Sequence, residues 1–351
     1  MNDVLELARP DIRSLKPYSH AAWDPAFTRL HANENPWTDE ANAVTFGLNR
    51  YSEPQPKALI AALAAHYSVQ PDQVLASRGS DEGIDLLIRA FCRAGRDRIM
   101  VCPPTFAMYG FAAAVQGAKV IEVPLDDAFG LDADAVLKGW SPCTKIIFLC
   151  SPNNPTGNNL DRGAIERVLA GLSGRAIVVL DEAYIELAGA GSCVSLQSRH
   201  PELVVLRTLS KAHGLAGARC GVVLAVPVII GLLARIIPPY ALPAPTIAAA
   251  LAALAPERLA RTQDRVCRLV AERERLRAAF AAMPIVRTIW PSDTNFLLVE
   301  FADAARAYVA AKRSGLLLRD FSRQPRLTGC LRISVGTPDD NDRLIASLAT
   351  A

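Results

Sequence analysis

Short apolar segments alternate with amphipathic segments between about residues 75 and 225. Six of the apolar segments are rich in Val, Ile and Leu and lack polar alternation; they span residues 98–102, 120–124, 145–150, 176–180, 203–206 and 221–225. Such segments are typical of strands that are buried on both faces of a mostly parallel sheet. Residues 84–91 and 161–172 have the pattern of helices that cover a sheet. The alternation predicts an α/β fold with a three-layer α/β/α large domain.

The alternation of apolar and amphipathic segments ends before residue 236, and a different pattern follows. Residues 236–256 carry no charge and could span a bilayer, but four prolines in the first half favour a loop that leads into an alanine-rich helix. One long helix is predicted over residues 257–283. Strands at 295–301, 316–319 and 330–335, with helices at 302–314 and from 338, predict a smaller α+β domain. We expect an N-terminal segment (1–40) that packs with this smaller domain, a large domain (41–245) and the small C-terminal domain (246–351).

Composition narrows the possible partners. The 351 residues carry a formal net charge of +3 without a Lys/Arg block, which argues against nucleic acid as a partner. The eight cysteines form no CxxC pair and most lie in apolar surroundings, so we expect buried thiols in a cytoplasmic protein. The five histidines form no HExxH motif and no cluster with cysteine along the sequence, so no metal site is predicted. The N-terminus lacks an apolar signal core, and we expect no membrane association.

Polar residues follow the predicted strands at their carboxyl ends, where open α/β sheets bind ligands. Asn154 lies in the proline-rich stretch 151–157 after one strand, which could equally be a simple reversing turn. Asp181 ends a wholly apolar strand, and Tyr184 follows it. Because an unpaired buried carboxylate is costly, Asp181 needs a partner, either a structural ion pair, a helix N-terminus or the protonated ring nitrogen of a ligand.

A third strand leads to Ser210 and Lys211, followed by small residues and by Arg219. A poorly hydrated lysine near another cation has a lowered pKa and can form an imine. Ser210 and Arg219 would suit a phosphate, and the glycine-led helix start at 79–83 offers a further anion site. A GxGxxG or Walker motif is absent from the sequence, which leaves a dinucleotide or nucleoside triphosphate unsupported. An imine-forming lysine, an acid for a pyridine nitrogen and a phosphate site together match the needs of pyridoxal 5'-phosphate.

At this point the sequence resembles the fold-type-I aminotransferases of the class-II pyridoxal-phosphate-dependent family, and most closely the histidinol-phosphate aminotransferases. The motifs that carry the resemblance are His-Ala-Asn-Glu-Asn-Pro at 31–36, Arg-Tyr at 50–51, Cys-Pro-Pro-Thr-Phe at 102–106, 151–157, Asp-Glu-Ala-Tyr at 181–184, 206–221 and Leu-Arg-Ile-Ser-Val-Gly at 331–336. They occur in the family's order and cover nearly the whole chain.

The resemblance implies a role for each cofactor residue. Lys211 would carry pyridoxal phosphate as a Schiff base and shuttle the proton, and Asp181 would keep the pyridine nitrogen protonated. Asn154 and Tyr184 would hydrogen-bond the ring hydroxyl. The phosphate would be held by the Ser80 and Asp81 backbone amides, by Ser210 and Arg219, and by Tyr51 of a second subunit, which implies a homodimer with a shared active site.

Other positions depart from the family or bind its substrates. Phe106 would stack on the cofactor where relatives often carry tyrosine. His213 and Ala218 stand where close relatives more often have Phe and Leu, and we interpret both as packing changes. The positions that match substrate-binding residues of the family are Tyr18, Asn33, Arg319 and Arg332.

The implied activity is the reversible transamination of L-histidinol phosphate with 2-oxoglutarate to imidazole-acetol phosphate and L-glutamate, a step of histidine biosynthesis. An aromatic-amino-acid aminotransferase or a threonine-phosphate decarboxylase of the same fold is the alternative. The stretch 319–321 with Gln-Pro at 324–325 and 329–332 favours the histidinol-phosphate type. A ligand-sensing regulator lacks room for a DNA-binding module before residue 51. A catalytically inactive relative conflicts with the intact set of cofactor residues.

Overall fold

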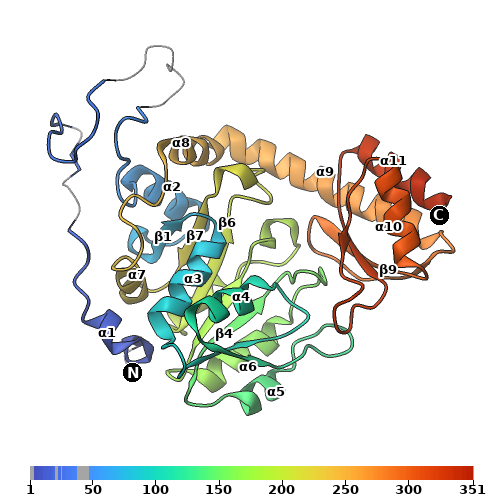
Figure 1. Cartoon of the computed structure of the whole chain (residues 1–351), viewed down its shortest axis with the longest axis horizontal. Coiled ribbons are helices and arrows are strands. Elements are labelled where there is room, and N and C mark those ends of the chain that lie inside the picture. Colours follow the sequence, from blue (N-terminus) through green and yellow to red (C-terminus); the bar gives the residue numbers. More distant parts are fainter. Residues whose placement is uncertain (1–3, 20–22, 25, 38–46, 351) are drawn as a thin grey trace.

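A seven-stranded sheet with the strand order β1-β7-β6-β5-β4-β2-β3 occupies the centre of the larger part of the molecule (Figure 1). The computed structural model describes residues 4–19, 23–24, 26–37 and 47–350. The strands are β1 Val74–Ser77, β2 Arg98–Val101, β3 Lys119–Glu122, β4 Thr144–Cys150, β5 Ile177–Asp181, β6 Leu203–Thr208 and β7 Gly221–Leu224. Only β7 runs antiparallel to its neighbours β1 and β6. The mostly parallel sheet predicted from the apolar segments is confirmed.

Side chains alternate between two apolar clusters along the central strands. In β4, Ile146 and Phe148 belong to one cluster, whereas Ile147 and Leu149 belong to the other. The first cluster packs against α3 Ser80–Phe91, α4 Met108–Gln116 and α7 Pro227–Leu233; the second packs against α2 Lys57–Tyr67, α5 Ala133–Gly139, α6 Arg162–Leu172 and α8 Ala244–Ala253. Helices therefore cover both faces, as the three-layer prediction requires.

Two strands of this sheet differ from the sequence prediction. Strand β1 lies where the alternation of apolar and amphipathic segments begins, but the sequence analysis did not predict it as a strand. Its four residues end in Ala-Ser, so the apolar segment is too short to indicate a strand. Strand β3 was predicted to be buried on both faces, and this is wrong: Lys119, Val120 and Glu122 are exposed. Because β3 is the outermost strand and pairs only with β2, solvent reaches its side chains.

A smaller four-stranded antiparallel sheet with the order β10-β11-β9-β8 forms the second part. Its strands are β8 Val286–Ile289, β9 Phe296–Phe301, β10 Arg319–Asp320 and β11 Cys330–Ser334, and its helices are α10 Ala304–Arg313 and α11 Pro338–Ala349. The 26-residue helix α9, Pro256–Ala281, runs from the first part to the second (Figure 1). Strand β8 was missed, and the strand expected at 316–319 is reduced to two residues. The boundary predicted at residue 245 falls inside α8, and the domain division stays a prediction.

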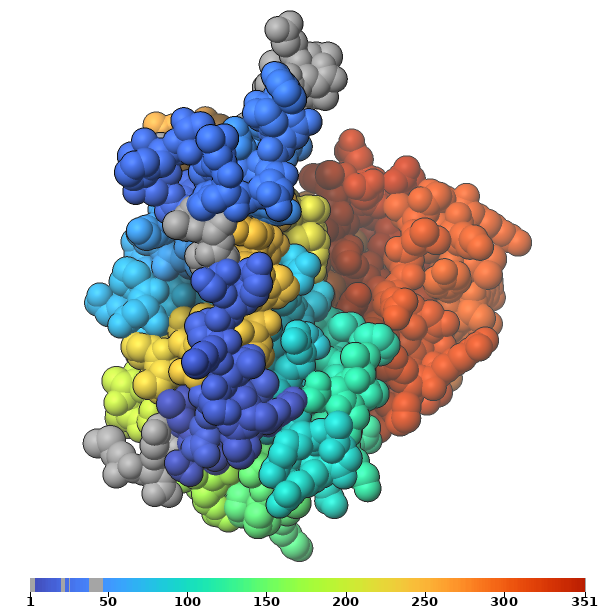
Figure 2. Space-filling view, turned by 60° about the vertical axis from the view of Figure 1, so that its left-hand side comes forward, coloured from blue at the N-terminus to red at the C-terminus, as the bar shows by residue number. Residues whose placement is uncertain are grey.

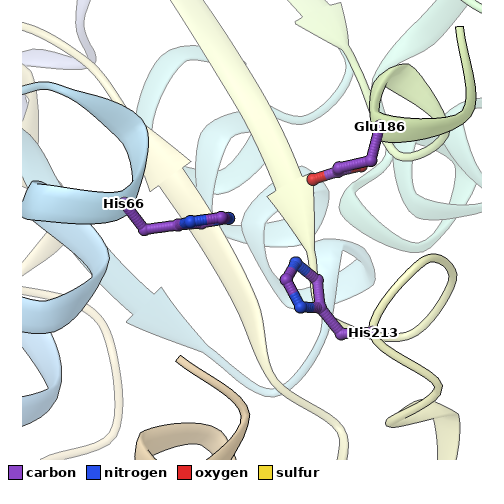
Figure 3. Close-up of side chains that lie close together, drawn as sticks. All are labelled: His66, Glu186 and His213. Atoms are coloured by element: carbon purple, nitrogen blue, oxygen red, sulfur yellow. The ribbon is translucent and has the colours of Figure 1, made fainter. Parts of the chain in front are cut away.

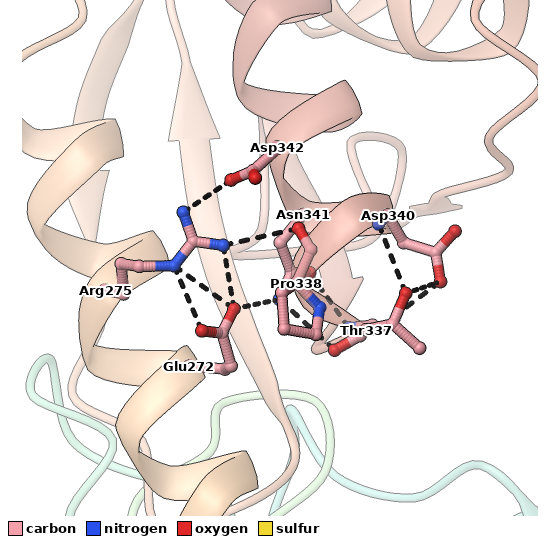
Figure 4. Close-up of polar contacts among 8 residues, drawn as sticks. Glu272, Arg275, Thr337, Pro338, Asp340, Asn341 and Asp342 are labelled. Carbon is pink, nitrogen blue, oxygen red and sulfur yellow. Dashed lines mark hydrogen bonds and ion pairs between the residues drawn. The ribbon is translucent and has the colours of Figure 1, made fainter.

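The start of α11 is attached to α9 by a polar network (Figure 4). Arg275 of α9 pairs with Glu272 on its own helix at 2.8 Å and with Asp342 of α11 at 2.6 Å. Thr337 and Asp340 form a capping box, in which Asp340 N–H donates to Thr337 Oγ1 over 3.2 Å. These contacts attach the segment that immediately follows β11 to α9.

The described N-terminal residues run along the outside of the larger part (Figure 1). Val4, Leu7 and Ala8 are buried in the apolar cluster with α3 and α7, and Arg9 N–H donates to Ala90 O over 3.0 Å. The segment was predicted to pack with the smaller domain, but its described residues 4–13 contact the larger sheet's helices through these apolar side chains. Within the described ranges, none of the helices is long and apolar enough to cross a membrane.

Candidate active site

A cavity of about 410 Å³ lies where β4, β5 and β6 end, at the junction of the two sheets. In the space-filling view the orange-to-red residues of the smaller sheet form a lobe beside the blue-to-green body, and the cavity takes residues from both (Figure 2). The predicted site residues that line it are Ser80, Asp81, Phe106, Asn154, Asp181, Tyr184, Ser210, Lys211, Arg219, Arg319 and Arg332. Side chains far apart in the sequence are therefore brought together in one site.

Asp181 is the buried acid of the site. It is the last residue of β5 and only 2% exposed. One carboxylate oxygen accepts a hydrogen bond from the Tyr109 hydroxyl at 2.8 Å and the other accepts one from Ala183 N–H at 3.1 Å. Burial raises the pKa of Asp181 to about 6, although both hydrogen bonds act in the opposite direction. A cationic ring nitrogen placed against this carboxylate would favour its ionised form.

Lys211 lies in the turn after β6, with its Nζ 5.4 Å from the centre of the Tyr184 ring. Burial, followed by the positive charge of Arg332, lowers the pKa of the Lys211 amine. This is the direction predicted from the sequence. The neighbouring cation that contributes most is Arg332 of the smaller sheet, whereas Arg219 contributes less. A larger fraction of neutral amine is available for attack on a carbonyl.

Hydrogen bonds of the Asn153 side chain hold the loop 151–157 together and attach it to residues 104–105. Asn153 Nδ2 donates to Pro104 O at 2.8 Å and to Thr156 Oγ1 at 2.7 Å, and Thr105 Oγ1 donates to Asn153 Oδ1 at 2.9 Å. The side chain of the next residue, Asn154, accepts a hydrogen bond from Arg332 Nη1 through its Oδ1. Its amide Nδ2 stays available to donate into the cavity.

One end of the cavity is formed by the start of α3. Gly79 precedes this helix with φ of +80°, and a Cβ there would lie 2.4 Å from Arg219 Nη2. A Cβ on Gly221 would lie 2.1 Å from the Gly79 carbonyl carbon, so both glycines are needed for the close approach of the two backbones. Arg219 Nη2 contacts Asp81 Oδ2 at 3.1 Å. Free backbone N–H groups, a helix N-terminus and a guanidinium make this end suitable for a phosphate.

The smaller sheet contributes two further arginines. Arg319 of β10 and Arg332 of β11 are directly opposed in the antiparallel register, and both line the cavity. The Arg332 guanidinium lies 5.4 Å from the centre of the Phe321 ring, and burial lowers the pKa of Arg332. With Lys211 and Arg219 there are four basic residues against the acids Asp81 and Asp181. The cavity therefore suits a ligand with more than one anionic group.

Three predicted site residues lie outside the cavity of this chain. Tyr18 is 72% exposed, Asn33 is exposed with φ of +55°, and Tyr51 is 50% exposed and stacks on Tyr240 with ring centres 4.4 Å apart. The sequence prediction placed Tyr51 in the site of a second subunit, so its position on the surface is compatible with that role. The roles of all three stay predictions.

Sequence reasoning missed several residues that shape the site. Tyr109 is fully buried in α4, stacks on Phe148 at 4.6 Å and donates to Asp181. A tyrosine one helical turn after Phe106 reads as a core residue, so the sequence contains no signal for its polar role. Thr208 supports Ser210 through a 2.9 Å hydrogen bond between their hydroxyls. The other lining residues without a predicted role are Thr105, Ala107, Cys150, Pro155, Ala183, Phe321 and Gln324.

Comparison with known proteins decides the family. The family model described as aminotransferase class I and II matches residues 31–348. The chain belongs to this family. A histidinol-phosphate aminotransferase of Stenotrophomonas maltophilia (strain R551-3) is 47% identical to this aminotransferase over 99% of this chain and 97% of that protein. Another from Shigella boydii serotype 4 is 42% identical over 98% and 97%.

Solved structures agree with this assignment. A histidinol-phosphate aminotransferase of Sinorhizobium meliloti, determined in complex with pyridoxal-5'-phosphate, has a TM-score of 0.78 and 26% identity, covering 89% of this aminotransferase and 84% of that chain. A Clostridium acetobutylicum structure at 18% identity, with a TM-score of 0.79 and coverage of 88% and 93%, shows the same fold. The predicted fold type and enzyme class are confirmed.

Proposed function

We propose that this aminotransferase uses pyridoxal 5'-phosphate to transfer the amino group of L-histidinol phosphate to 2-oxoglutarate, forming imidazole-acetol phosphate and L-glutamate. The reaction is reversible and belongs to histidine biosynthesis. The observation that carries the substrate proposal is the opposed pair Arg319 and Arg332, which lines the same cavity as Lys211. The relatives named histidinol-phosphate aminotransferase, at 42–47% identity over nearly the full chain, support it.

The cavity residues fit the cofactor in chemistry and arrangement. When bound, pyridoxal phosphate supplies an electron sink for the bond that breaks at the substrate carbon. Asp181 would hold the proton on the ring nitrogen, because its buried carboxylate is most stable beside a cation. Asn154 Nδ2 and the Tyr184 hydroxyl would donate to the ring oxygen. Phe106 would cover one face of the ring.

The start of α3 and the turn after β6 would bind the cofactor phosphate. The Ser80 and Asp81 amides, the Ser210 hydroxyl and Arg219 would hold it, and Arg219 would exchange its contact with Asp81 for one with the phosphate. Lys211 Nζ would hold the cofactor covalently until the substrate amine replaces it. The Lys211 Nζ would also carry the proton at the substrate carbon, because its lowered pKa favours the neutral amine that can accept a proton.

Substrate recognition would come from the arginine pair. A guanidinium binds carboxylate and phosphate groups with the same planar set of donors. One pair of arginines would therefore accept the phosphate of histidinol phosphate in one half-reaction and a carboxylate of 2-oxoglutarate in the other. Tyr18 and Asn33 would add further polar contacts if the N-terminal segment reaches a neighbouring site.

We also infer a homodimer whose active sites take Tyr51 from the opposite subunit, in a cytoplasmic enzyme that acts on small molecules. Large side chains with apolar or aromatic groups are exposed between residues 15 and 51: Leu15, Tyr18, Trp23, Phe27, Leu30, Trp37, Leu48 and Tyr51. Such a concentration of exposed apolar surface is typical of a protein interface. The cytoplasmic location is supported by eight cysteines that form no disulfide.

Steady-state kinetics with matched substrates test the substrate proposal. L-histidinol phosphate is compared with L-histidinol, each with 2-oxoglutarate. Two lost charge-assisted hydrogen bonds should lower kcat/KM by about 100-fold or more for the substrate without phosphate. Arg332→Leu should abolish most of this preference. The control is Arg323→Leu, which alters an exposed arginine in the loop between β10 and β11 that does not line the cavity.

Other results would replace the substrate assignment. Equal activity towards both substrates would show that the phosphate is not recognised. Faster turnover of aromatic amino acids would favour an aromatic-amino-acid aminotransferase. Release of carbon dioxide from threonine phosphate would favour the decarboxylase of the same fold.

A further inference from the structure

Three side chains that could bind a metal ion lie close together near the turn that carries Lys211. His66 comes from the last turn of α2, Glu186 from the 3-10 helix η4 Ile185–Leu187, and His213 from the segment after Lys211 (Figure 3). Each offers one nitrogen or oxygen atom, and these atoms all lie within 4.8 Å of one another. The residues are far apart in the sequence, so no motif along the chain predicts the cluster.

The cluster contains buried polar atoms without hydrogen-bond partners. His213 is 6% exposed, and neither its Nδ1 nor its Nε2 has a partner among the described residues. The same holds for Glu186 Oε2. Buried polar atoms are almost always paired, because leaving them unpaired costs about 1–3 kcal/mol each. A species bound between these atoms would satisfy them.

Charge favours a cation as that species. Arg207 donates to Glu186 Oε1 at 2.7 Å and to Glu182 Oε2 at 3.1 Å, so one guanidinium faces two carboxylates. Glu186 uses only Oε1 for Arg207, which leaves Oε2 to face the two imidazoles. The cluster therefore offers one carboxylate oxygen and two ring nitrogens as donors, and Glu186 belongs to a group in which two carboxylates contact one guanidinium.

We propose that His66, Glu186 and His213 bind a divalent transition-metal ion of the zinc class, with water as a fourth ligand. Two imidazoles and one carboxylate are a common ligand set for Zn²⁺. Tetrahedral bonds of about 2.0–2.1 Å place ligand atoms about 3.4 Å apart. Because the three atoms lie within 4.8 Å of one another, no pair has to approach by more than about 1.4 Å. An oxygen-seeking ion such as Mg²⁺ is disfavoured by the two nitrogens.

The position of the site links it to the catalytic lysine. His213 is two residues after Lys211, and Gly214 N–H donates to Lys211 O over 3.0 Å within the same turn. A metal ion at the cluster would attach this turn to α2 and η4. The ion would touch neither substrate nor cofactor, so its role would be to fix the turn and not to take part in the reaction.

Calorimetric titration of the pyridoxal-phosphate-loaded enzyme with zinc chloride, after dialysis against a chelator, tests the proposal. We expect saturable binding of one ion per chain and a raised unfolding temperature in its presence. His213→Phe and His66→Gln should each weaken binding by about tenfold or more, because each removes a direct ligand. His200→Gln, a histidine that contacts Glu202 at 3.3 Å outside the cluster, should bind zinc as the unaltered enzyme does.

A crystal soaked in zinc chloride gives the second, independent result. Anomalous scattering at the zinc edge should place a peak between the three side chains. Binding that is absent, or unchanged in both His213→Phe and His66→Gln, would overturn the proposal and leave ordered water as the occupant. The visible absorbance of the bound cofactor verifies folding of each variant. Because metal binding is measured directly, the result does not depend on which amine the enzyme accepts.

Discussion

Removal of the Tyr109 hydroxyl group should show how far its hydrogen bond lowers the pKa of the buried Asp181. Tyr109→Phe deletes the donor that lies 2.8 Å from Asp181 and leaves the ring stacking on Phe148 intact. A hydrogen bond to a charged group contributes about 1.5–3 kcal/mol. If this stabilisation is lost from the ionised carboxylate during turnover, kcat/KM falls by about 10- to 150-fold.

The same change should alter the pH dependence. Burial already raises the pKa of Asp181 to about 6, and the Tyr109 hydrogen bond lowers it. Without that bond the pKa rises further, so the acidic loss of activity should begin at higher pH in the variant. In the cofactor-free protein the raised pKa contributes stability that is present below the unfolded value of about 3.9 and is lost as pH rises through about 6. Tyr109→Phe should extend this loss to higher pH.

Steady-state kinetics between pH 5 and 9, together with chemical unfolding of the cofactor-free protein, measure both effects. Tyr67→Phe is the matched control, because the Tyr67 hydroxyl is buried and has no partner among the described residues. We expect it to keep the activity and pH profile of the unaltered enzyme. The same profile for Tyr109→Phe and Tyr67→Phe would refute a role of Tyr109 in positioning and tuning Asp181.

Further changes address the other parts of the site. Gly79→Ala should weaken cofactor binding by about tenfold, because a Cβ at φ of +80° would displace Arg219; in Gly95→Ala, where the φ is +70° but the space is open, cofactor affinity measured by fluorescence titration should not change. Lys211→Ala should abolish turnover while the far-ultraviolet circular dichroism is preserved. Full activity of this variant would contradict the assignment of Lys211 as the cofactor-binding lysine. Mixing Lys211→Ala with Tyr51→Ala and allowing subunits to exchange should restore up to about a quarter of the activity, since heterodimers contain one intact shared site; no recovery after proven exchange would contradict a shared active site.

The sequence was sufficient to predict the residues at strand ends. Asn154, Asp181 and Lys211 each follow an uninterrupted apolar segment, and parallel strands bring such ends to one edge of a sheet. Contacts between distant elements could not be predicted in this way. The opposition of Arg332 to Arg319 depends on the register of a two-residue strand, and its effect on Lys211 depends on how the two sheets meet.

The remaining differences between the sequence prediction and the structure concern which residues are buried and which side chains from distant segments lie together. Strand β3 has an apolar centre, but its place at the sheet edge exposes it, and strand order cannot be read from local pattern. His213 was interpreted as a packing change in a loop, since only the folded chain brings His66 and Glu186 to it. Tyr109 was not predicted as a site residue, because its polar partner Asp181 lies 72 positions away in the sequence.

The most direct measurement of the central claim is the half-reaction with L-histidinol phosphate and no keto acid. The pyridoxal-phosphate-loaded enzyme is mixed with the amine, and its visible absorbance is followed before and after 2-oxoglutarate is added. We expect the absorbance of the lysine-bound cofactor to be lost with the amine and to return with 2-oxoglutarate, and we expect Arg332→Leu to slow the first change greatly. An unaltered spectrum with L-histidinol phosphate, from enzyme that does respond to another amino donor, would contradict it.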